Sequence, residues 1–175
     1  MAYPTNLKFR ILTPLAGAQP IAETSTTQNH PLGTVVTAEE YGAGYGVGEF
    51  IYLKGVASTA KGDLVVFDQK AATTTRSVAA SKGRLAVAMS ANVASQYGWY
   101  QISGEAVVNT TAAGTGAANA NLIVTATAGQ ATVAATGAAC VVGAICKTAQ
   151  DTPSAGYTQV QIDRPFVPGF TITQP

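Results

Sequence analysis

The side chains that could perform catalysis are few and lie far apart in the sequence. His30 is the only histidine, beside Pro31, so a histidine-based triad or multi-histidine metal site would have to centre on it. The nine acidic residues are scattered, whereas paired-acid chemistry needs two carboxylates held within several ångströms. Asp63 and Asp68 flank one strand signal, which is typical of turn residues. The sequence therefore predicts a protein that is not an enzyme and has no catalytic residues.

The sequence also lacks the patterns that bind metals and cofactors. Cys140 and Cys146 would lie roughly 20 Å apart along an extended strand, beyond the limit of about 7 Å for a disulfide. No C-x-x-C pair or D-x-D-x-D calcium loop occurs. The run Tyr41-Gly-Ala-Gly-Tyr-Gly-Val-Gly48 does not fit G-x-G-x-x-G. We therefore expect no metal, no cofactor and two free thiols, as in a protein made in a reducing cytoplasm.

Composition and charge exclude several classes of protein. Of all residues, 11% are charged and 47% are hydrophobic, and the formal net charge is +1. This balance argues against nucleic-acid binding, which needs clustered cations, and against disorder. The longest apolar segment, residues 133–145, carries Thr136, Gly137 and Gly143 and is shorter than the roughly 20 residues of a membrane span. We expect a chain that binds neither nucleic acid nor membrane.

Strands must position whatever surface the protein uses. Short β-rich runs bounded by Gly, Ser, Thr and Lys-Gly pairs predict strands over residues 50–53, 63–67, 84–89, 98–102, 105–108, 121–124, 131–133, 140–142 and 158–162. Thr and Gly interrupt the abundant alanines, so no helix of ten or more residues is expected. Many short strands with even spacing indicate an all-β fold: a compact small barrel or sandwich of antiparallel strands.

The strand signals occur twice in the same order. Four pairs of segments match at offsets between 56 and 60: residues 48–49 with 104–105, 63–66 with 121–124, 84–89 with 140–145, and 101–102 with 161–162. Four signals in one order at nearly one offset indicate an internal duplication of a four-strand unit.

Residues 1–48 differ in composition from the rest of the chain. They hold four of the eight prolines and end in alternating glycines, which are unsuited to sheet interior. They also carry apolar side chains that need cover, including Phe9, Leu12, Tyr41 and Tyr45. We expect an extended N-terminal arm over residues 1–48 that adds little to stability, with a poorly ordered tail as the alternative. The remaining division is a β-barrel-like domain over 49–168 and a C-terminal tail over 169–175.

An uncharged stretch predicts self-association. No charged residue occurs between Glu105 and Lys147, and a neutral surface of this length is suited to an interface. The alternative is a two-sided β core. We expect an oligomer, in particular a homotrimer.

Aromatic side chains supply the candidate contact residues. Trp99 is expected to be an anchor in the core or in a subunit contact, and a sugar-stacking platform is the alternative. The expected interaction residues are Phe9, Leu12, Tyr41, Tyr45, Trp99, Tyr100, Phe166 and Phe170.

Five segments follow one another in a characteristic order. They are Gly48-Glu-Phe-Ile-Tyr-Leu-Lys-Gly-Val56, Lys61-Gly-Asp-Leu-Val-Val-Phe67, Gly83-Arg-Leu-Ala-Val-Ala-Met89, Gln96-Tyr-Gly-Trp-Tyr-Gln-Ile-Ser-Gly104 and Val142-Gly-Ala-Ile145. Together they resemble the capsid decoration, or cement, proteins of tailed bacteriophages, over about residues 46 to 165. The match departs from the family at residues 87–89, which read Val-Ala-Met where the pattern often has Gly-Val-Ala.

The resemblance implies a structural virion protein. Such a protein is a compact β-barrel that binds the outer surface of a phage head, commonly as trimers, and bridges neighbouring capsomers. Its partners would be the phage major capsid protein and itself, on the outer capsid surface, after synthesis in the host cytoplasm. The alternative from another class is a receptor- or glycan-binding β module of a phage fibre or a bacterial surface.

Overall fold

The computed structural model of the chain describes residues 2–92, 95–111, 116–135 and 140–169. Across these ranges every regular element is a strand, and no helix occurs that could cross a membrane. The expected all-β fold class is confirmed. The strands are β1 Phe9–Ile11, β2 Thr24–Ser25, β3 Val35–Glu40, β4 Gly46–Lys54, β5 Leu64–Phe67, β6 Thr74–Arg76, β7 Gly83–Ala88, β8 Tyr97–Asn109, β9 Asn121–Val124, β10 Ala131–Ala134, β11 Val142–Cys146, β12 Pro153–Ser154 and β13 Tyr157–Val167.

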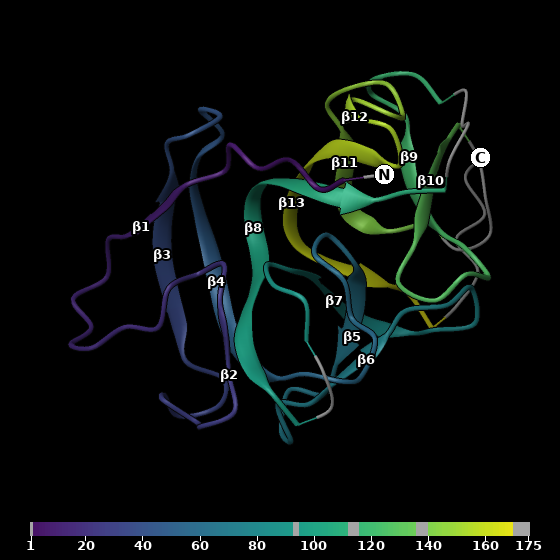
Figure 1. Cartoon of the computed structure of the whole chain (residues 1–175). Helices are drawn as coiled ribbons and strands as arrows, with labels where there is room; N and C mark the ends of the chain where they lie inside the picture. Colours follow the sequence, from purple (N-terminus) through teal and green to yellow (C-terminus); the bar gives the residue numbers. More distant parts are fainter. Residues whose placement is uncertain (1, 93–94, 112–115, 136–139, 170–175) are drawn as a thin grey trace.

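Most strands belong to one antiparallel sheet that curls into a half-barrel (Figure 1). Its order is β1-β3-β4-β8-β13-β7-β5-β6; β11 and β12 also pair with β13, and β2 pairs with β8. β9 and β10 form a separate hairpin. The two longest strands, β8 and β13, pair in the middle of the sheet and connect its two halves.

The pairing of strands repeats in part along the chain: the β5–β7 ladder is reduced in the second repeat to a single bridge between Ile123 and Cys140. In the first repeat, β8 pairs with β4 and β7, and β5 pairs with β6 and β7. In the second repeat, β13 pairs with the end of β8 and with β11, while β9 pairs with β10. The register also repeats, because the β5–β6 pair Val65–Arg76 corresponds to the β9–β10 pair Ile123–Thr132. Each repeat therefore has five strand segments, one more than expected, and the two repeats share β8.

One offset differs from the expected value. The pair Val87–Gln101 of the first repeat corresponds to Ile145–Gln161 of the second. Val87 and Ile145 are thus 145 − 87 = 58 positions apart, rather than 56. Beyond this pair the β11–β13 register shifts between Val142 and Ala144, where the step from Val142 to Ala144 is opposite the longer step from Phe166 to Ile162, so the extra residues lie in β13.

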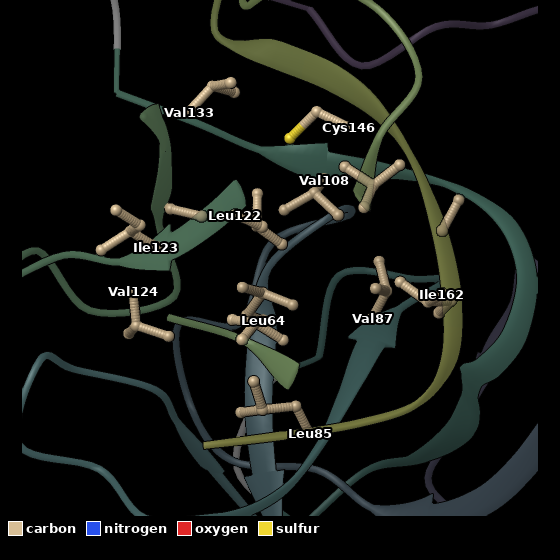
Figure 2. Close-up of a cluster of buried hydrophobic side chains, with 14 of the residues drawn as sticks. Leu64, Leu85, Val87, Val108, Leu122, Ile123, Val124, Val133, Cys146 and Ile162 are labelled. Carbon is tan, nitrogen blue, oxygen red and sulfur yellow. The ribbon is translucent and has the colours of Figure 1, made fainter. Parts of the chain in front are cut away.

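Each repeat has its own buried core. In the first repeat, Ile51, Leu53, Val65 and Tyr100 are at the centre of one cluster. The larger second cluster fills the other half, where side chains of β9, β10 and β11 meet Leu64, Leu85 and Val87 of the first repeat (Figure 2). Because β5 and β7 contribute to both clusters, the two repeats fold as one body.

The uncharged stretch supplies much of the second core. Its large apolar side chains, such as Leu122, Val133 and Cys146, are buried within the chain itself. Ile145 is the large apolar side chain that stays exposed, at 43%. The alternative of a two-sided core therefore accounts for the lack of charge. A homotrimer stays a prediction, and this stretch no longer argues for it.

An extended arm over residues 1–48 is not confirmed. β3 pairs along its whole length with β4, so the expected boundary at residue 48 falls inside β4. Ile21 is 2% exposed and belongs to a third cluster with Tyr52 and Trp99, on the outer side of the sheet. The N-terminal segment, drawn in purple in Figure 1, thus covers one side of the sheet. At the other end, β13 ends at Val167, and residues 170–175 of the expected tail lie outside the described residues.

We expect Ile21→Ala to destabilise the protein. Removing a fully buried isoleucine side chain costs about 2–5 kcal/mol in the free energy of unfolding, whereas an arm outside the core would give no change. Leu12→Ala is the matched control, because Leu12 lies in the same segment but is 45% exposed, so its effect should stay within about 0.5 kcal/mol. Urea unfolding of the two variants measures the difference. Equal midpoints would mean that residues 1–48 form an arm outside the core.

Candidate functional site

In the described part of the chain six large apolar side chains are exposed: Leu12, Val35, Tyr41, Val47, Ile145 and Phe166. Several of them lie along one surface at the β1, β3, β4 and β13 part of the sheet. We call this surface the open face and define it by Leu12, Val35, Glu39, Val47, Glu49, Arg164 and Phe166. Exposed apolar residues between charged ones are typical of a surface that contacts another protein.

Strand register places Val35 and Val47 on the same side of the sheet. Val35 is opposite Ile51, and Glu39 is opposite Val47; residues directly opposite each other share a face. Ile51 belongs to the first-repeat core. The open face therefore lies on the same side of β3 and β4 as that core. It is the part of this side that β5 and β7 do not cover.

Two ion pairs cross the open face. Arg10 of β1 pairs with Glu39 of β3, and the Arg164 Nη2 atom lies 2.6 Å from the Glu49 Oε2 atom. All four side chains are substantially exposed, so each pair contributes at most about 1 kcal/mol to stability. Their effect is to hold the charged groups around the apolar side chains in fixed positions.

A shallow hollow of about 410 Å³ lies at the β13 end of the open face. Gly83, Arg84, Arg164 and Phe166 line it. A second hollow, of about 460 Å³, also includes Gly83 and Arg84 and continues along β5 and β6 past Lys82. Arg84 therefore lies where the two hollows meet.

The carboxylate of Glu40 holds the turn between β3 and β4. It accepts hydrogen bonds from the backbone N–H groups of Lys8, Gly42, Ala43 and Tyr45, at 2.7–3.1 Å. Burial by itself would raise the pKa of Glu40, but these four donors outweigh it and lower the pKa below its usual value. The turn that they fix presents the exposed ring of Tyr41.

The structure separates the expected interaction residues into three groups. Leu12, Tyr41 and Phe166 are exposed. Phe9 and Tyr45 are half-buried, and the Phe9 ring packs against Phe50 with ring centroids 5.7 Å apart. Phe170 lies outside the described residues.

Trp99 and Tyr100 are both fully buried within the chain. They lie on opposite sides of β8, Trp99 in the cluster under the N-terminal segment and Tyr100 in the first-repeat core. The Trp99 Nε1–H donates to the Gln19 carbonyl at 2.8 Å, and burial raises the pKa of Tyr100 to about 12. Trp99 is thus the core anchor that the sequence suggested and not a sugar-stacking platform.

Sequence reasoning missed Val47, Arg84 and Arg164. Val47 stands in a glycine-rich run that did not predict a strand, and Arg164 lies past the last predicted strand. The signal for Val47 and Arg164 was the alternation of exposed and buried residues, which continues past the predicted ends of these strands. It can be recognised once the pairing of β4 and β13 is known.

The groups considered for catalysis have structural roles. His30 is buried, and its Nε2 atom accepts a hydrogen bond from the Gln19 amide at 3.0 Å. Asp63 is completely buried and paired with Arg76 at 2.9 Å. Within the described part of the chain, no group of His, Cys, Asp and Glu side chains could hold a metal ion. Both cysteines are free, and burial raises the pKa of Cys146 to about 11.

No protein-family model matches the chain, and no curated protein matches it.

We expect the stabilising effect of Glu40 to disappear in acid. Because its folded pKa lies below the unfolded value of about 4.3, the ionised group stabilises the fold above that value, and the effect is lost as pH falls through the folded pKa. Glu40→Gln should therefore cost about 1–3 kcal/mol at pH 7 and progressively less towards pH about 3.

Glu39→Gln is the matched control for this experiment, because Glu39 is the neighbouring residue and its only ion pair is exposed. Its cost at pH 7 should stay below about 1 kcal/mol. Urea unfolding of both variants across this pH range gives the comparison. A Glu40→Gln effect that does not change with pH would contradict the role of the four amide donors.

Proposed function

We propose that this protein is a capsid decoration protein that binds the outer surface of a phage head through its open face. Its partner is the major capsid protein, and it acts as a homotrimer that bridges neighbouring capsomers. It is made in the host cytoplasm and resides on the virion surface. The observation that carries the proposal is the exposure of Val35, Val47 and Phe166 beside the ion pairs of Glu39 and Glu49, with Val35 and Val47 on one face of the β3–β4 pair.

The sequence resemblance supports the same proposal. The five segments that resemble decoration proteins correspond to β4, β5, β7, β8 and β11, which belong to the frame of the two repeats. An all-β body of this size agrees with the compact barrel that the resemblance implies. The open face is formed largely by β3 and β4 at one edge of this frame, together with residues of β13.

Stabilisation of the head then follows from mass action. Only the assembled lattice offers the complete binding site, so each bound copy lowers the free energy of the assembled state relative to free capsomers. A trimer binds through three equivalent contacts, and the second and third contacts form at high effective concentration. Modest contacts in each copy are therefore sufficient for tight attachment.

The glycan-binding alternative has lost its main candidate. Trp99 and Tyr100 are buried, so neither ring can stack on a sugar. Among the described residues the exposed aromatic rings are Tyr41, in the turn between β3 and β4, and Phe166, in β13. Among the described residues no pair of exposed aromatic rings is in contact.

We expect Val47→Asp to weaken binding to emptied phage heads at least tenfold. The change places a charge on the open face, and losing the burial of one valine costs about 1.5 kcal/mol or more, which is about tenfold in the dissociation constant. Cosedimentation of the purified protein with heads measures it, with circular dichroism to show that the variant is folded.

Ile145→Asp is the matched control, because Ile145 is similarly exposed but lies in β11 outside the open face. It should bind heads as the unchanged protein does. If neither variant affects binding, or if the protein binds a glycan array but no heads, the proposal is wrong. Multi-angle light scattering tests the homotrimer separately: a monomer both in solution and in a reconstruction of the decorated head would contradict it.

A further inference from the structure

Arg84 differs from the other three arginines in having no carboxylate partner among the described residues. Arg10, Arg76 and Arg164 each form an ion pair with a carboxylate of the same chain. Across the described ranges, no carboxylate lies within ion-pair distance of Arg84. An exposed arginine without an internal partner is free to bind an anion supplied by another molecule.

The position of Arg84 makes it accessible. Arg84 is exposed, it lines both hollows, and it is paired in the sheet with Phe166. Gly83 precedes it with φ of 115°, a conformation that favours glycine. Because residue 83 has no side chain, the floor beside the Arg84 guanidinium is open, and the backbone of a partner can approach it closely.

The charges around Arg84 favour an anion. Lys82 lines the same hollow as Arg84, and Arg164 lines the other. Glu49 pairs with Arg164. Asp68 also lines the larger hollow and accepts from the amides of residues 70 and 71, so that lining holds two cations and one carboxylate. The hollows therefore keep a positive potential that an incoming carboxylate would neutralise.

Resting on the proposed function, we propose that Arg84 binds a carboxylate of an acidic peptide segment on the capsid protein. A guanidinium can donate two parallel N–H···O bonds to an aspartate or glutamate side chain. Lys82 adds charge, while Phe166, 39% exposed, packs against the apolar part of the segment. Arg84 then determines which surface of the lattice the open face recognises.

The lining of the hollow favours a peptide over an acidic glycan. Sugar hydroxyl groups are usually bound by several amide and carboxylate side chains around an aromatic ring. The residues that surround Phe166 in its hollow are Gly83, Arg84 and Arg164, which supply cations and open space. They match a short segment that combines carboxylates with apolar atoms.

The test uses two independent measurements on the full chain. In the first, an octaglutamate peptide is titrated into the ¹⁵N-labelled protein, with octaglutamine and sialyllactose as comparison probes. We expect octaglutamate alone to shift the Arg84 Nε–H and Gly83 amide signals. Arg84→Lys keeps the charge but loses the paired geometry, and it should raise the dissociation constant about tenfold, whereas Lys61→Gln, at a half-buried lysine outside the hollows, should not.

In the second measurement, the same variants are bound to emptied heads. If the unchanged protein and Arg84→Lys bind heads equally well, the inference is overturned while the proposed function stands. If no form binds heads, the proposed function fails, and the peptide titration decides the inference by itself. Signal shifts with sialyllactose instead of octaglutamate would overturn the inference in favour of an acidic glycan. An equal loss of affinity in Lys61→Gln would also overturn it, because the binding would then depend on overall positive charge and not on Arg84.

Discussion

The whole structure depends on the close crossing of β4 and β8 at two glycines. β8 pairs with β4 and β7 over its first half and with β13 over its second half. The change occurs at Gly104, where φ is 98° and a Cβ atom would lie 2.8 Å from the Gly48 Cα atom. A Cβ atom at Gly48 would lie 2.6 Å from the Ser103 carbonyl oxygen. Two glycines therefore let one strand serve both repeats, and the same crossing places Val47 and Glu49 on the open face.

A buried carboxylate joins the repeats at a second point. Asp63 accepts from the Arg76 Nε–H at 2.9 Å within the first repeat and from the Asn109 amide group at 2.8 Å in the second. Arg76 also donates to the Ala128 carbonyl at 2.6 Å. Breaking a buried pair of this kind costs about 3–5 kcal/mol, because the remaining charge stays buried. Asp63 is thus part of the core, although its place after Lys-Gly is typical of a turn.

The repeats were predictable from the sequence, and the N-terminal part was not. Repeated strand signals keep their spacing because pairing register must be preserved on both sides of a shared strand. Residues 1–48 were misread because proline and glycine were taken to exclude sheet. Pro4 precedes β1, and Pro14, Pro20 and Pro31 lie between strands. The final glycines, Gly46 and Gly48, belong to β4, where Gly48 packs closely on the Ser103 carbonyl and Gly46 has a φ of 78°. The open face was unpredictable for a further reason: its residues come from β3, β4 and β13, which only the pairing brings together.

The two repeats have kept one backbone pattern and lost any similarity in charge. By register, Val87 corresponds to Ile145, so Arg84 corresponds to Val142 at the same offset. Arg76 likewise corresponds to Thr132. The uncharged stretch of the second repeat, residues 106–146, fills much of a large apolar core. The first repeat has a smaller core and retains cations along its hollows. The two halves of the sheet thus differ in what their side chains do: those of the second repeat fill the body, and the unpaired Arg84 of the first repeat is the residue that we propose for recognition.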